Sequence, residues 1–148
     1  MINELKVMQQ MVEVIGSHLN EYLDEELPVI SDKQVLLEFP DVDKMPFPVM
    51  FYVQPDYAAY EEETTCSDKT DFRISVFIMC KRDTKANLTL KTYGYYNALY
   101  ELLKTNYTLY GAIAGTQIIE THFYPAIEAN ANVQGVELSV STEFTKDF

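Results

Sequence analysis

The chain has 148 residues, of which 47% are apolar and 23% are charged, with five glycines and six prolines. This length suits one domain with a single core, and the composition excludes a disordered chain and a collagen-like repeat. The 23 acidic and 11 basic residues give a net charge of −12, which opposes specific binding to nucleic acids and to anionic membrane surfaces. No apolar run approaches the roughly 20 residues of a membrane-spanning helix, and the first residues lack the pattern of a secretory signal.

The first predicted element is an amphipathic helix. Apolar residues recur in steps of three and four from Leu5 to Leu23, which places one apolar stripe along a helix. Pro28 disfavours helical geometry at Leu27, so we expect the helix to end there. The stripe is too short for a coiled coil, and packing across a sheet is the better interpretation.

Three strands are expected next. Residues 35–39 have a period of two, and Pro40 closes this short strand. Residues 49–53 are apolar throughout, which is typical of a strand buried on both faces. Residues 56–68 are polar and acidic without periodicity, so they predict an exposed loop. The third strand presents one apolar face, formed by Phe72, Ile74, Val76, Ile78 and Cys80.

A second helix and two more strands complete the predicted fold. Residues 88–105 have helical spacing, and strands are expected at 117–124 and 136–144. The short links between most strands favour antiparallel pairing. The predicted fold class is α+β, a mostly antiparallel sheet of about five strands with the long N-terminal helix and the second helix packed on it. The order is helix, three strands, helix, two strands, in a single domain over residues 1–148.

Charge is distributed unevenly along the chain. Residues 1–70 carry 15 acidic and four basic side chains, whereas residues 71–148 carry eight and seven. The strongest acidic run is Glu61, Glu62 and Glu63, and the strongest basic cluster is Lys81, Arg82, Lys85 and Lys91. A subunit with two oppositely charged sides suits head-to-tail self-association. The alternative is that both runs only solvate the surface.

Tyrosine is unusually frequent, with 11 in the chain and six between positions 93 and 110. Tyr93, Tyr100 and Tyr107 are spaced by seven, whereas Tyr95 and Leu99 take another face of the helix. A helix with two apolar faces must cover the second one with its own core or with a neighbouring subunit. Tyr93 and Tyr100 are therefore candidate interface residues, and the alternative is that half-exposed tyrosines shield the sheet.

No residue pattern predicts catalysis, a cofactor or a metal site. Cys66 and Cys80 stand alone, without the second pair of a zinc or thioredoxin-like motif, and we expect Cys80 to be buried. His18 and His122 have no nucleophile motif beside them. Phosphate-binding glycine motifs are absent from the sequence. We therefore expect no enzyme.

The order of these elements carries a family resemblance. The chain has a long N-terminal helix, a strand ending at Phe39-Pro40, a strand-loop-strand unit over 48–54 and 70–82, and a helix that contains Tyr95–Tyr100. It closes with two strands, and the segment Gln134–Val140 belongs to the last of them. This pattern resembles the tail terminator (neck or tail-completion) proteins of long-tailed bacteriophages and their prophage relatives.

The resemblance implies a structural protein without catalytic residues or cofactors. It implies a homo-oligomeric ring, commonly of six subunits, that stops growth of the tail tube and joins the tail to the head connector. Such a protein would be cytoplasmic during assembly and part of the virion of an active phage. Our hypothesis for the subunit contact brings the acidic loop of one subunit to the basic cluster of the next, and its candidate residues are Glu61, Glu62, Glu63, Lys81, Arg82, Lys85, Tyr93 and Tyr100.

Two other function classes remain open at this point. One is a small α+β ligand-binding protein or enzyme with a tyrosine-lined pocket, as in nuclear-transport-factor-like folds, which predicts a concave apolar cavity. The other is an adaptor that pairs its first helix with a partner helix.

Overall fold

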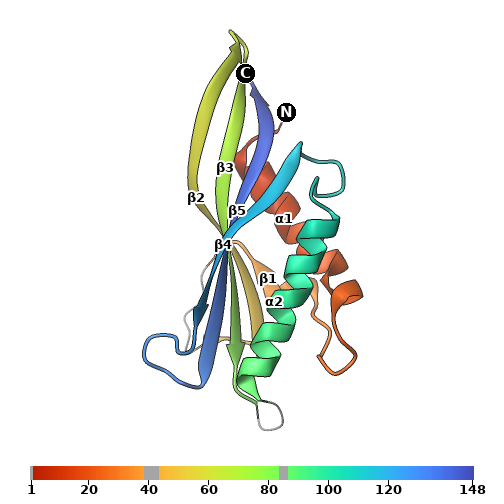
Figure 1. Ribbon diagram of the computed structural model, residues 1–148, viewed down its shortest axis with the longest axis vertical. Helices are drawn as coiled ribbons and strands as arrows, with labels where there is room; N and C mark the ends of the chain where they lie inside the picture. Colours follow the sequence, from red (N-terminus) through yellow and green to blue (C-terminus); the bar gives the residue numbers. More distant parts are fainter. Residues whose placement is uncertain (1, 39–43, 84–86) are drawn as a thin grey trace.

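The computed structural model describes residues 2–38, 44–83 and 87–148, which form two α-helices against one five-stranded sheet (Figure 1). The elements follow in the order α1 (Glu4–His18), β1 (Val35–Leu36), β2 (Val49–Thr64), β3 (Ser67–Lys81), α2 (Leu88–Thr105), β4 (Gly115–Tyr124) and β5 (Val133–Asp147). The strand order in the sheet is β1-β2-β3-β5-β4; β1 runs parallel to β2, and the other neighbouring pairs are antiparallel. The predicted α+β class and the predicted order of elements are confirmed.

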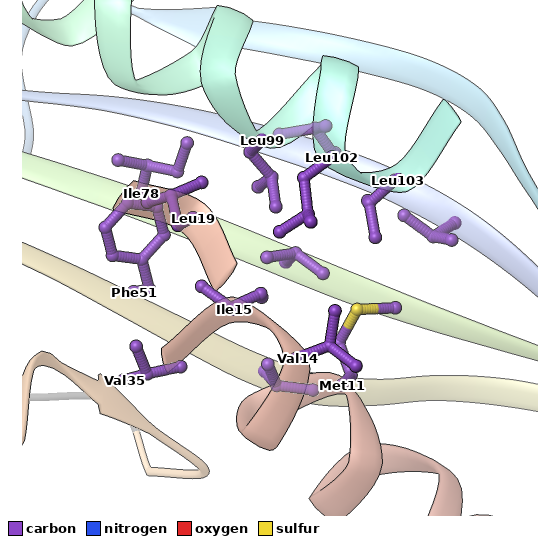
Figure 2. Close-up of a cluster of buried hydrophobic side chains, with 14 of the residues drawn as sticks. Met11, Val14, Ile15, Leu19, Val35, Phe51, Ile78, Leu99, Leu102 and Leu103 are labelled. Atoms are coloured by element: carbon purple, nitrogen blue, oxygen red, sulfur yellow. The ribbon is translucent and has the colours of Figure 1, made fainter. Parts of the chain in front are cut away.

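Both helices cover one face of the sheet (Figure 1). α1 contacts β1 and β2, and α2 contacts β3, β5 and β4. Figure 2 shows the core between the helices and the sheet, with these labelled side chains: Met11, Val14, Ile15, Leu19, Val35, Phe51, Ile78, Leu99, Leu102 and Leu103. Because burial of such side chains is the main stabilising term in folding, this layer holds the fold together. α1 buries Val7, Met11, Val14 and Ile15 against the sheet. The predicted stripe is offset from this face, because Leu5 is 51% exposed and Met8 and Val12 are only partly buried.

α1 is shorter than the sequence predicts. It ends at His18 rather than at Leu27, and a 3₁₀ turn over Leu19–Tyr22 follows it. The side-chain amide of Asn20 then donates to the backbone carbonyl of Ile30 and accepts from its N–H, both at 2.8 Å. This contact draws residues 23–30 back toward the helix end. A long-range hydrogen-bond pair therefore accompanies the early stop, whereas the prediction relied on the proline alone.

The returning segment packs on α2. Leu27 lies over Gly94, where a Cβ atom would come within 2.6 Å of Leu27 Cδ1. The glycine inside α2 therefore permits this close approach. Beside it, the Tyr95 hydroxyl donates to the Pro28 carbonyl at 2.6 Å, and the Tyr95 ring meets Phe51 edge-on.

We expect Tyr95→Phe to lower the free energy of unfolding by about 1 kcal/mol, because it removes this hydrogen bond and leaves the ring packing unchanged. Urea unfolding measures the change. Tyr107→Phe is the matched control, because Tyr107 is 57% exposed and its change should stay within about 0.5 kcal/mol. Equal changes in the two variants would contradict the role of the Tyr95 hydroxyl.

The region that was predicted to be an exposed acidic loop, residues 56–68, is a β-hairpin. β2 continues to Thr64 and β3 begins at Ser67, so only Thr65 and Cys66 form the turn. We call residues 56–73 the hairpin arm; it extends past the helix layer at one end of the molecule (Figure 1). Most side chains of β2 in the arm are exposed on both faces, so the sequence lacks the alternation that marks a half-buried strand. Pairing of β3 with both β2 and the end of β5 keeps the arm in the sheet.

The remaining strand predictions differ mainly in their bounds. β1 ends at Leu36, and residues 39–43 of its predicted range and turn lie outside the described part of the chain. β4 and β5 begin two or three residues earlier than expected, and β5 continues to Asp147. The predicted apolar face of β3 is confirmed, since all five of its side chains are buried.

The opposite face of the sheet is open over much of its length. A small apolar cluster covers one end, and it consists of Met45, Met50, Tyr52, Phe77, Met79 and Val133. Farther toward the arm this face carries polar groups, including Ser75 and Glu137, which are joined by a 2.8 Å hydrogen bond. We refer to it as the open face and to the other as the helix face.

Candidate assembly surfaces

The predicted charged interface residues lie at the two ends of the subunit, and the two predicted tyrosines lie on α2. Glu61, Glu62 and Glu63 are exposed near the tip of the hairpin arm. Lys81 and Arg82 are exposed at the other end of β3, whose 15 residues span roughly 45 Å at about 3.3 Å per residue. The acidic and basic groups therefore lie at opposite ends of one subunit. Lys85 lies outside the described residues.

The basic end is smaller than the sequence suggests. Lys91 is 4% exposed, and its ammonium donates to Asp83 at 3.2 Å and to the Lys81 carbonyl at 3.4 Å. Its charge is thus compensated within the chain. Arg82 is held by a 3.2 Å hydrogen bond from its Nε to the Asn132 side chain and keeps its charge at the surface.

An aromatic strip follows the side of α2 toward the sheet edge. Tyr96 lies at its centre, with ring centroids 5.6 Å from Tyr93, 6.1 Å from Tyr100 and 5.2 Å from Phe123 of β4. Tyr93 and Phe123 are more than half exposed. The predicted pair Tyr93 and Tyr100 thus belongs to one surface. Tyr107 does not extend it along the helix, because α2 ends at Thr105.

Sequence reasoning missed two members of this strip. Tyr96 stands three residues after Tyr93 and four before Tyr100, and that spacing shares one helix face, so the signal was present in the sequence. Phe123 belongs to a strand, and its position beside α2 depends on the strand order. Exposed aromatic side chains that combine area with a polar tip are enriched in protein interfaces.

The hairpin arm is anchored to α1 by three side chains. The Tyr60 hydroxyl donates to Glu4 Oε1 at 2.7 Å, and the Lys146 ammonium donates to both Glu4 oxygens at 2.9 and 3.0 Å. Burial alone would raise the pKa of Glu4, but the hydrogen bonds from Tyr60 and Lys146 outweigh it and lower the pKa. The hydrogen bond from the Tyr60 hydroxyl to Glu4 also raises the pKa of Tyr60.

This anchor predicts a pH dependence of stability. Because the Glu4 pKa is lowered in the folded state, its stabilising contribution is present at neutral pH and is lost as the pH falls below about 4.5 through the folded-state pKa. We expect Glu4→Gln to destabilise the chain at about pH 7 and to differ less from the parent chain at about pH 3. Chemical unfolding at both pH values measures this. A difference that grew on acidification would contradict the anchor.

The two cavities beside α2 are not enclosed by the tyrosine cluster. An apolar cavity of about 150 Å³ lies between α2 and the ends of β4 and β5, and it includes Tyr93 and Tyr124. A depression of about 550 Å³ beside the segment 24–27 includes only Tyr93 among its tyrosines. Ligand sites usually enclose about 300–1,000 Å³ with a few convergent polar groups, and here Tyr96 and Tyr100 pack on other rings instead.

The cysteines and histidines do not converge on a reactive centre. Cys80 is buried, as predicted, and burial raises the pKa of its thiol to about 11, whereas Cys66 is exposed at the hairpin turn. His18 stacks on Tyr110, and His122 lies 3.3 Å from Glu120. Within residues 2–38, 44–83 and 87–148, no group of three or more potential ligands could hold a metal ion, and no helix there is long and apolar enough to span a membrane.

Comparisons with known proteins give a likeness of fold. No family model and no curated protein matches the chain. Among solved structures, the chain is similar to one from an extracellular contractile injection system, described as the PVC sheath/tube terminator in the extended state, with a TM-score of 0.50 and 12% identity. The likeness covers 99% of this chain and 58% of that one. A chain from the virion of a native gene transfer agent particle is similar over 86% of this chain and 92% of its own length, with a TM-score of 0.44 and 13% identity.

The fold therefore matches that of the sheath/tube terminator over almost the whole chain. The chain spans little more than half the length of that structure. At 12% identity the likeness concerns the fold.

Proposed function

We propose that this chain is a structural assembly protein that forms a ring on the end of a tail-like tube and stops its growth. The observation that carries the proposal is the match of 99% of the chain to the fold of a sheath/tube terminator. Tube and head-connector proteins are the proposed partners, and a hexamer is the proposed state. The proposed location is the cytoplasm during assembly and the particle afterwards. An acidic subunit would let DNA pass through the ring without adhering.

Two features of the surface support self-assembly. A cyclic ring requires two different surfaces on one subunit, each fitting the other on the next copy. The sheet has β4 and the aromatic strip at one edge and β1 and α1 at the other. The pocket alternative receives less support, because the tyrosines pack on one another along a surface.

The charged ends have a role in approach between copies in this proposal. The carboxylates of Glu61–Glu63 and the cations of Lys81 and Arg82 give the subunit opposite charge at its two ends. Such a distribution orients copies as they meet and raises the association rate, whereas exposed ion pairs add only about 0–1 kcal/mol each. Apolar contacts must then supply most of the affinity.

We expect Glu62→Lys to slow self-association and to weaken its dependence on salt. Stopped-flow light scattering at low and high ionic strength measures both quantities. Glu26→Lys is the matched control, because Glu26 is an exposed carboxylate in the segment between α1 and β1 and should change the rate less. An unchanged rate and an unchanged salt dependence for Glu62→Lys would mean that the acidic tip does not affect the rate at which two copies associate.

Electron microscopy of the chain mixed with tail tubes tests the function itself. The expected result is a ring at one end of each tube and a narrow length distribution when the chain is present during tube growth. Tubes of unchanged length with bare ends would overturn the proposal. Turnover of a small molecule that depends on a residue of the 150 Å³ cavity would favour the pocket alternative.

A further inference from the structure

The sheet has two strand edges that no described strand pairs. β4 is the last strand on one side, because its ladder joins β5 alone. On the other side β1 pairs with β2 only at Phe51 and Tyr52, and no described strand pairs with the outer side of Gln54–Glu63, although the Gln54 side chain donates to the carbonyl of Leu37 just after β1. An edge strand presents backbone N–H and C=O groups that can pair with another chain.

We propose that β4 of one copy pairs antiparallel with Gln54–Glu63 of the next copy, so that one sheet continues around the ring. This inference rests on the proposed function and names its subunit contact. The directions agree, because neighbouring strands from β2 through β3 and β5 to β4 are antiparallel at every step. The rotation that relates neighbouring copies in a ring places β4 of one copy beside β2 of the next, and the two strands are then antiparallel. The lengths agree as well, since each edge offers ten residues.

The side-chain faces fit at both ends of the contact. Ile118 and Phe123 lie on the helix face of β4, the first against the core and the second against Tyr96. Ala58 and Tyr60 lie on the helix face of β2, the first against the core and the second bonded to Glu4 of α1. Setting Ile118 opposite Tyr60 also sets Gln117 opposite Glu61. Helix-face residues then meet helix-face residues from this pair toward the tip of the arm.

Bulges restore this match at the far end of the contact. β4 has a register shift between Ile118 and Glu120, and β2 has one between Pro55 and Tyr57 and a second between Glu62 and Thr64. Each bulge adds one residue and reverses the alternation of its own strand. Between the first two bulges the faces are out of step, with Glu120 opposite Ala58, and they agree again where Phe123 lies opposite Pro55. The stagger also leaves the β1–β2 pairs at Phe51 and Tyr52 in place, and only Gln54, which is bonded to Leu37, adjoins them.

Charge favours this pairing over the pairing of like edges. The free edge of β2 carries Asp56 and Glu61–Glu63, so two copies of it would bring carboxylates together. Against β4, Glu61–Glu63 meet the uncharged Gly115, Thr116 and Gln117, and Asp56 falls opposite His122. The last turn of α2 carries Lys104, and a Cβ atom at Gly115 would lie 3.9 Å from Tyr107, just beyond that turn. Lys104 thus comes to the same side of the shared sheet as Glu62.

Cysteine cross-linking between two variants tests the contact. Both carry Cys66→Ser, which removes the exposed native thiol, and one carries Gln117→Cys while the other carries Glu61→Cys. Directly opposed residues of antiparallel strands have Cβ atoms about 4.5–5.5 Å apart, close enough for a disulfide after a small adjustment. The expected result is a linked species of two chains in the mixture and none in either variant alone. Glu26→Cys replaces Glu61→Cys in the control mixture, which should stay unlinked.

Three results would overturn the proposal. One is the absence of linked product at every protein concentration, and another is equal linking with the Glu26→Cys control. The third is self-linking of a Glu120→Cys variant in place of the mixed product, which would indicate pairing of two β4 strands about a two-fold axis. Linked copies that leave tubes uncapped would refute the proposed function alone. Capped tubes without linking would refute the edge contact alone.

A charge exchange gives a second measurement. Lys104→Glu and Glu62→Lys should each weaken association at equilibrium by up to about fivefold, and the double variant should recover most of the loss. Sedimentation at several concentrations yields the constants. Additive losses in the double variant would count against the placement of Lys104 beside Glu62.

Discussion

Leu99→Ala is expected to lower the free energy of unfolding by about 2–5 kcal/mol. Leu99 is fully buried in α2 and lies in the core between the helices and the sheet (Figure 2). Truncation removes apolar contacts and leaves a cavity that rigid strands on one side cannot collapse to fill. The expected loss is a large share of the total stability of a small domain.

Urea unfolding of Leu99→Ala beside Leu90→Ala measures this effect against a matched control. Leu90 belongs to the same helix but is 73% exposed, so its truncation should change stability by less than about 0.5 kcal/mol. The midpoint for Leu99→Ala should fall without a change in slope if the unfolded state is unaffected. Similar midpoints for the two variants would mean that the helix layer does not stabilise the sheet.

Elements with one buried face could be predicted from the sequence. The alternation from Phe72 to Cys80 and the helical spacing over residues 88–105 each arise because one side of the element packs in the core between the helices and the sheet, away from water. The hairpin arm lacks this cause, because most of its β2 residues are exposed on both faces. Its strands form through backbone pairing with β3 and β5, which leaves little trace in the pattern of apolar residues. The early end of α1 depends on Asn20 and Ile30, which are ten residues apart.

The candidate surfaces were predictable only where they lie on one element. Tyr93 and Tyr100 share a helix face that spacing reveals, and the structure places them in one strip. The exposed edge of β4 follows from the strand order, in which β5 lies between β3 and β4 although it comes last in the chain. No local pattern encodes that order. The separation of Glu62 from Lys81 likewise depends on the arm being a pair of extended strands.

Tyr93→Ala is expected to weaken self-association by about 30-fold, the effect of losing an interface hot spot worth about 2 kcal/mol. Tyr93 is 56% exposed at the end of the aromatic strip, so its truncation should leave the free energy of unfolding within about 0.5 kcal/mol of the parent chain. The strip borders β4 through Phe123, and a neighbouring copy paired with β4 would cover it. Sedimentation over a range of concentrations gives the association constant.

The matched control for this prediction is Tyr110→Ala. Tyr110 is 48% exposed, but it stacks on His18 beside α1, away from the β4 edge. The two substitutions therefore remove a similar exposed aromatic area, one from the aromatic strip and the other from the surface beside α1. A selective loss for Tyr93→Ala would locate the contact on the strip, because general surface stickiness would weaken both variants alike. Equal association of the two variants would instead mean that the tyrosines of α2 only shield the sheet and that copies meet elsewhere.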